Sequence, residues 1–185
     1  MRAVAKAISD LFRRGLGDCA GGAAIEFAFI APVLIAAYLM LAETGGAMMM
    51  KKRATHTASA IADVTAQKDS LTNTDMTNIF KIGPALLYPH GQGADFRAVV
   101  SSIKEDDKGV MKVVWSSGHN TTARTVGSTI TKEISADFLK SGESVIYTET
   151  SFDYKSPVGE LFKSKVTMTS NAMIRPRNAS EVTRK

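Results

Sequence analysis

The residues best placed to do unusual chemistry are two acidic residues in an apolar stretch. Glu26 directly precedes the run from Phe27 to Met50, in which Glu43 is the single charged residue. A carboxylate near the start of a membrane helix is costly at depth unless it finds a partner or a proton. Glu26 is therefore either tolerated in the headgroup region or held there by an interaction that the sequence alone does not name.

The other reactive side chains form no recognisable catalytic or metal site. His56, His90 and His119 lack a short ligand spacing such as HExxH, and one cysteine, Cys19, excludes an internal disulfide framework and a multi-cysteine cluster. No nucleophile elbow, P-loop or dinucleotide fingerprint is present. The consecutive methionines Met48–Met50 point in different directions on a helix, which favours contact with lipid over a soft-metal site. The sequence predicts no enzyme, no metal and no cofactor.

Composition indicates a folded chain with an appendage. The 185 residues are 44% hydrophobic and 22% charged, which excludes a wholly disordered protein. The net charge of +5 is spread along the chain and forms no basic stripe. We therefore expect no nucleic-acid partner.

The apolar run predicts a membrane-spanning helix. Residues 27–50 would form about 36 Å of helix, enough to cross a hydrocarbon core of about 30 Å. Its start is apolar on every side, whereas a helix of a small soluble domain would show a polar face. Lys51, Lys52 and Arg53 end the run. Four basic residues precede the span and three follow it, so the positive-inside rule does not decide the orientation.

The first 21 residues have the character of a basic leader. They combine a short apolar helical face with basic side chains (Arg2, Lys6, Arg13, Arg14), and Gly21-Gly22 stands where the apolar helix begins. A secretory signal would carry its small-residue cleavage site after the apolar run, and here that site precedes it. The order of the two features is the opposite of an ordinary signal peptide.

The segment Gly21–Phe27 resembles the processing site of type IV pilin-like precursors. In that family a prepilin peptidase cuts after a glycine, and glutamate is the fifth residue of the product. Counting back from Glu26 puts the cut between Gly21 and Gly22, and the double glycine leaves a cut after Gly22 as the alternative. The longer stretch to Leu34 resembles TadE/TadG-like pseudopilins of tight-adherence (Tad, Flp) pilus systems. Pro32, six residues after the glutamate, and the second acidic residue Glu43 fit that pattern.

The resemblance implies a function and a set of partners. It implies a minor pseudopilin in pilus biogenesis and surface adherence, with a single inner-membrane span and a periplasmic C-terminal head, or a place in the extracellular pilus. Its partners would be the prepilin peptidase, other Tad pseudopilins, the major pilin and the inner-membrane assembly platform. Glu26 would pair with a neighbouring subunit's amino terminus, Pro32 would kink the helix, and Glu43 would be a second acidic membrane position. The alternative is an unprocessed, signal-anchored periplasmic binding or adaptor domain, which has no use for Gly21 with Glu26.

The rest of the chain predicts an α+β head of the type IV pilin kind, in which a long helix packs on a small antiparallel sheet. Helical spacing extends from about Ala23 to Gln67, and Leu71–Thr74 offers caps for a second helix that Gly83-Pro84 interrupts. The period then changes to that of strands at 96–103, 110–115, 144–155 and 166–174. The expected organisation is a leader at 1–21, a transmembrane helix at 22–53, a head at 54–177 and a flexible tail at 178–185.

Overall fold

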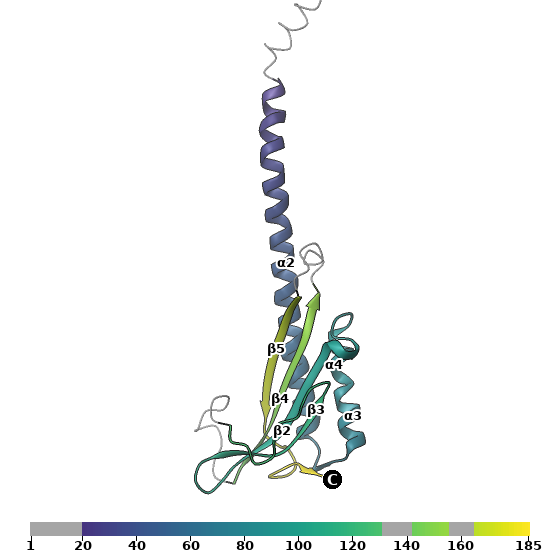
Figure 1. Cartoon of the computed structure of the whole chain (residues 1–185), viewed down its shortest axis with the longest axis vertical. Coiled ribbons are helices and arrows are strands. Elements are labelled where there is room, and N and C mark those ends of the chain that lie inside the picture. Colours follow the sequence, from purple (N-terminus) through teal and green to yellow (C-terminus); the bar gives the residue numbers. More distant parts are fainter. Residues whose placement is uncertain (1–19, 131–141, 156–164) are drawn as a thin grey trace, which may run out of the picture. The chain divides into compact units, whose positions relative to one another are not determined.

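The computed structural model describes residues 20–130, 142–155 and 165–185 (Figure 1). The chain divides between Thr44 and Gly45 into two compact units. The predicted long helix is confirmed as α2 (Ala20–Ala66), which contributes to both units. The second unit continues with β1 (Ser70–Leu71), α3 (Asn73–Phe80), α4 (Ile82–Leu87), a 3₁₀ turn (Gly93–Asp95), β2 (Phe96–Glu105), β3 (Met111–His119), β4 (Ser144–Lys155), β5 (Lys165–Ile174) and β6 (Thr183–Arg184).

The predicted α+β class is confirmed by a four-stranded antiparallel sheet. The strand order is β3-β2-β4-β5. β2 and β4 therefore lie in the centre, and each pairs with a strand on both sides. β3 runs to His119, beyond the predicted end at Trp115, because its polar residues 116–119 pair with Ala98–Ser101 of β2. That pairing is a tertiary interaction, and the apolar alternation of the sequence does not report it.

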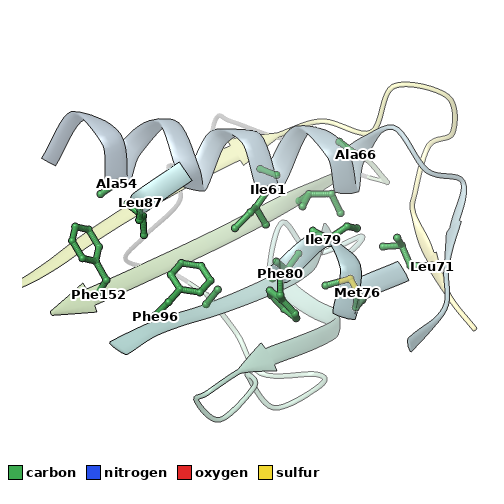
Figure 2. Packing of buried hydrophobic residues seen from close by; sticks show 14 of the residues in the cluster. Ala54, Ile61, Ala66, Leu71, Met76, Ile79, Phe80, Leu87, Phe96 and Phe152 are labelled. Carbon is green, nitrogen blue, oxygen red and sulfur yellow. The ribbon is translucent and has the colours of Figure 1, made fainter. Parts of the chain in front are cut away.

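The core of the head lies between the second half of α2 and one face of the sheet. Small side chains recur every fourth residue on the buried side of the helix: Ala54, Ala58, Ala62 and Ala66. Spacing of four residues keeps side chains on one helix face, and alanine lets the helix backbone approach the strands closely. Figure 2 shows Ala54 near Phe152 at one end of this contact and Ala66 near Ile79 of α3 at the other, with Ile61 directed into the core between them.

The predicted caps of the second helix are confirmed, but the break falls at Lys81 and not at Gly83-Pro84, which lie inside α4 (Ile82–Leu87). Thr72 accepts a hydrogen bond from Asp75 N (3.1 Å) while the Asp75 carboxylate accepts one from Thr72 N (2.9 Å), a capping box. These bonds lower the pKa of Asp75. Within α4, a Cβ on Gly83 would lie 2.1 Å from the Phe96 ring. Gly83 therefore lets α4 approach the Phe96 ring closely.

The C-terminal segment differs from the flexible tail expected at 178–185. Val182 is fully buried, and its carbonyl accepts a hydrogen bond from the Trp115 indole Nε1 (2.7 Å). β6 pairs with β1 in parallel, and Lys185 N donates to Leu71 O (2.9 Å). A polar composition predicts mobility, but one buried valine and one indole partner far away in the sequence hold this segment on the head.

The predicted turn between β2 and β3 is organised by Asp106. Its carboxylate accepts hydrogen bonds from Lys108 N (3.0 Å) and Val110 N (2.9 Å) and pairs with Lys112 Nζ (2.8 Å). Led by the Lys112 interaction, these contacts lower the pKa of Asp106 from 3.8 to about 2. The turn closes through Gly109, whose φ of 76° suits glycine.

We predict a pH-dependent contribution of Asp106 to stability. A carboxylate with a lowered pKa in the folded state stabilises above its unfolded pKa and loses that effect as pH falls through the folded pKa. The melting temperature of a fragment beginning at Gly45 should therefore exceed that of its Asp106→Asn variant above about pH 4, and the difference should vanish near pH 2. Asp107, which forms no hydrogen bond or ion pair with a described residue, gives the control: Asp107→Asn should match wild type throughout. A constant Asp106→Asn deficit down to pH 2 would contradict the assignment.

A second prediction concerns a hydroxyl buried between helix and sheet. Thr148 is fully buried, and its Oγ1 has no hydrogen-bond partner among the described residues. An unpaired buried polar group costs about 1–3 kcal/mol, so Thr148→Val should raise the free energy of unfolding by about 1 kcal/mol. Thr65 is equally buried but donates to Ile61 O (2.7 Å), so Thr65→Val should gain less or lose. Urea unfolding of the same fragment measures both, and equal effects would refute the explanation.

Candidate functional site

The described part of the first unit is a helix whose apolar side chains have no protein to pack against. Its large side chains are 41–76% exposed on all sides: Ile25, Phe27, Phe29, Ile30, Val33, Leu34, Ile35, Tyr38, Leu39, Met40 and Leu41. None of the most apolar 18-residue stretch of α2 is buried. By length and composition α2 can cross a membrane, and lipid is the environment that would remove this surface from water.

The predicted processing site lies in the first turn of this helix. Gly21 and Gly22 follow Ala20, where α2 begins, and a Cβ added to either glycine would meet no atom within 4 Å. Glycine costs about 1 kcal/mol relative to alanine inside a helix. Because neither glycine is required by packing among the described residues, the pair is a feature without a structural explanation. The leader proper, residues 1–19, lies outside the described residues.

Glu26 follows one turn later on the same exposed helix. Its side chain is exposed, and it forms no hydrogen bond or ion pair with any residue that the structure describes. The carboxylate thus has both oxygens available to a partner outside the chain. In lipid or in a protein core such a group requires an opposite charge or a proton.

Pro32 and Glu43 lie farther along α2. Pro32 is inside the helix and exposed, and Glu43 is half-buried, 17 residues after Glu26. Seventeen residues of helix rise about 26 Å and rotate by about 100° modulo full turns, so the two carboxylates are at different depths and on different faces. They therefore cannot act as a catalytic pair, and each must be satisfied separately.

The head contacts α2 earlier than the predicted boundary between residues 53 and 54. Met50 is 5% exposed and Ala47 packs against the same core. A Cβ on Gly46 would lie 3.1 Å from the Tyr154 hydroxyl, so Gly46 leaves room for that tyrosine. Sequence analysis missed these contacts because Gly46–Met50 reads as a continuation of the apolar run.

Basic residues just beyond this contact are tied to the head by backbone carbonyls. Lys51 Nζ donates to Thr169 O of β5, and Arg53 Nη1 donates to Tyr88 O (3.1 Å) after α4. Lys51 and Arg53 therefore brace the helix against two separate segments. The sequence identified them only as the charges that end the apolar run.

A polar groove of about 710 Å³ lies on the head and is lined by residues of α2, β2, β4 and β5. Two of its three charged lining residues are in ion pairs: Arg97 binds Asp153 (2.8 Å), and Glu149 accepts two hydrogen bonds from Arg124 (2.7 and 2.8 Å). The third, Lys51, donates to the backbone carbonyl of Thr169. The charges of Arg97 and Glu149 are neutralised within the protein, so these two residues do not define a site for a charged ligand.

The histidines do not assemble a catalytic set among the described residues. His119 stacks on Phe80 (5.2 Å between ring centroids), and His90 contacts the Tyr154 ring (5.2 Å). His56 is exposed on α2. No group of three or more His, Cys, Asp or Glu able to hold a metal ion occurs in the part of the chain that the structure describes.

Comparison with known proteins gives one match, and it falls on the helix just described. Residues 21–63 match the family model of the TadE-like protein. The similarity to this family covers less than a quarter of the 185 residues. The matched segment begins at Gly21 and ends on the buried part of α2, so it includes Gly22, Glu26, Pro32 and Glu43.

The TadE-like family consists of structural pilus components and is not a known enzyme family, and the similarity of this chain to it is confined to residues 21–63. Residues after 63, including the whole sheet, lie outside the match. No curated protein and no solved structure matches the chain. The family match therefore concerns α2 and gives no information about the sheet of the head.

Proposed function

We propose that this TadE-like protein is a minor pseudopilin, a structural and assembly subunit of a Tad (Flp) pilus. The observation that carries the proposal is the unpacked glycine pair followed by an exposed, unpartnered Glu26 at the start of an apolar helix. The family match supports the assignment to a Tad pilus. A plain membrane anchor needs neither the glycines nor the carboxylate.

The proposed role of the glycine pair is to present a scissile peptide bond to a membrane prepilin peptidase. Cleavage requires a locally extended backbone, and glycine adopts extended conformations with no side chain to obstruct the enzyme. A cut between Gly21 and Gly22 creates a new ammonium on Gly22, four residues before Glu26. The mature chain lacks Cys19 and therefore has no thiol, which suits an oxidising compartment.

The proposed role of Glu26 is to bind the new ammonium of a neighbouring pilin-like subunit. Either charge alone is expensive in lipid or a filament core, and the pair satisfies both. A subunit docked one step out of register would leave a buried charge unpaired. The interaction therefore selects axial register as well as contributing affinity.

The proposed location is the bacterial inner membrane, with one span and the head in the periplasm, before or instead of entry into the extracellular pilus. The proposed partners are the prepilin peptidase, other Tad pseudopilins, the major pilin and the assembly platform, in a pathway that leads to surface adherence. The competing candidate is an unprocessed periplasmic adaptor on the same anchor. Its support is the folded head with a polar groove, which would serve either role.

Blocking the cleavage site tests the first step. Gly21→Leu should abolish the shift in gel mobility that a co-expressed prepilin peptidase produces, because a bulky side chain then occupies the scissile position. Membrane insertion should be unchanged, since the apolar helix is intact. Gly45→Leu is the matched control, because Gly45 is also in α2 with no atom within 4 Å of an added Cβ. If wild type and both variants have the same mobility with and without the peptidase, the chain is an unprocessed anchor.

Removing the charge of Glu26 tests the second step. Glu26→Gln keeps the shape and hydrogen-bonding capacity but leaves a partner's ammonium unpaired, a loss of about 3–5 kcal/mol, or roughly two to four powers of ten in association. The variant should be cut and inserted normally yet fail to co-purify with pilin-like partners. Glu43→Gln, about 26 Å farther along the helix, should have a much smaller effect. Normal piliation of the Glu26→Gln variant, with cleavage verified, would leave Glu26 without a pairing role.

A further inference from the structure

The exposed large apolar side chains of the head are gathered at one end. Among the described residues of the second unit they are Met48, Met49, Tyr88, Val126 and Val166. Met48 and Met49 lie on the first turn of α2 in this unit, on the side away from the buried Met50. An apolar cluster on the surface of a folded head marks a contact that the isolated head does not make.

Contacts within the head place two of the other residues at the same end. The carbonyl of Tyr88 accepts the hydrogen bond from Arg53, one turn after Met49. Val166 pairs across the sheet with Tyr154, whose hydroxyl lies against Gly46. Figure 1 shows the end of β4 and the start of β5 side by side here. Four side chains from three segments therefore surround the point where α2 joins the head, and only Val126 is elsewhere.

Basic side chains border this cluster. Lys51 and Arg53 are exposed, although each also donates to a backbone carbonyl of the head. Lys52 is exposed and forms no hydrogen bond or ion pair with a described residue. We call Met48, Met49, Lys52, Tyr88 and Val166 together the entry face. It combines methionine, tyrosine and valine with a free ammonium.

The spacing of the charges along α2 gives the entry face a position relative to a bilayer. From Glu26 to Glu43 the helix rises about 26 Å, slightly less than a hydrocarbon core of about 30 Å. A short span keeps the residues that follow it close to the lipid, because the bilayer and flanking side chains adjust to cover the mismatch. Met48 and Met49 come five and six residues after Glu43, a helical rise of about 8 Å, which is the scale of the headgroup layer.

We infer that the entry face rests on the anionic lipid surface at which α2 leaves the membrane. The apolar side chains lie at the boundary between acyl chains and headgroups, and Lys52, with Lys51 and Arg53, faces lipid phosphates. Tyrosine and long basic side chains are the residues that proteins place at this depth, with the apolar body inward and the polar tip in water. The inference rests on the proposed membrane anchoring, and it assigns the head a preferred docked state that the anchoring alone does not require.

Lipid accounts for the entry face better than a second protein does. The entry face begins at Met48, four residues after the first unit ends at Thr44. With the apolar part of α2 in the membrane, the covalent chain therefore holds the entry face near the headgroup layer. A neighbouring subunit would need a complementary acidic, apolar surface at the same height. An anionic bilayer supplies both requirements all around the helix: the headgroups carry negative charge, and the acyl chains beneath them are apolar.

The test uses the full chain in vesicles of phosphatidylcholine, with and without phosphatidylglycerol. In a Cys19→Ser background, an environment-sensitive fluorophore is attached through Tyr88→Cys, Val166→Cys or, as the control, Val126→Cys. Val126 is also exposed, and it adjoins Gly127, whose N–H donates to Val113 O of the edge strand β3. Lipids with a nitroxide on the headgroup should quench the labels at 88 and 166 several-fold more than the label at 126. Adding Lys52→Gln should lower the ratio of docked to undocked head about fivefold in anionic vesicles and leave it unchanged in neutral ones.

Three outcomes would overturn the inference, and a separate label tests the anchor. Equal quenching at 88 and 126 would mean that the head does not rest on lipid. Quenching insensitive to phosphatidylglycerol and to Lys52→Gln would remove the electrostatic contact. If the label at position 88 becomes less accessible to water as the protein density in the vesicles rises, and if this protection persists in detergent, a second copy of the chain covers the entry face. A label at Val33→Cys, which acyl-chain nitroxides must quench, reports insertion of α2, so loss of that signal alone contradicts the proposed anchoring.

Discussion

The packing of α2 on the sheet through alanines at every fourth position is the interaction on which the rest of the head depends. Ala54, Ala58, Ala62 and Ala66 bring the helix backbone close to β2 and β4, and the larger side chains of α3 and the sheet close the core around them. This contact extends back to Met50 and Gly46. α2 therefore begins to pack on the head immediately after its exposed apolar segment. One continuous helix thus has apolar side chains exposed on all sides first and packs one side against a protein core afterwards.

That change of environment explains where the charges lie. The exposed segment before Thr44 carries only Glu26 and Glu43, whereas Lys51, Lys52 and Arg53 appear as soon as the helix has gained contact with the head. A charge costs little where water or headgroups reach it and much where they do not. Glu26 is the exception, and under the proposed processing a neighbouring subunit's new amino terminus would be its partner.

Apart from the entry face, the described surface of the head offers few features that call for a binding partner. On the polar groove, Arg97 with Asp153 and Arg124 with Glu149 neutralise each other. Partly exposed ion pairs of this kind contribute little to stability. They do neutralise the charges of Arg97 and Glu149, so these two residues need no charged ligand. Four of the five large apolar side chains that are exposed in the described part of the head, all but Val126, belong to the segments around the start of α2 in this unit.

The elements of this protein follow from local patterns that the sequence displays openly. An apolar run of that length specifies α2, the Thr72–Asp75 capping box starts α3, and alternation marks β2, β4 and β5, because each signal depends on residues close together in the chain. The proposed processing and pairing roles of Gly21, Gly22 and Glu26 rest on the resemblance of this segment to type IV pilin-like precursors, and no packing among the described residues accounts for the two glycines. Tertiary structure alone decided three things. Val182 is buried because Trp115 donates to its carbonyl, residues 116–119 are strand because β2 pairs with them, and Gly46–Met50 belongs to the head because Tyr154 and the core meet it there. In each case the deciding partner is distant in sequence, and a local pattern carries no information about a contact that only folding creates.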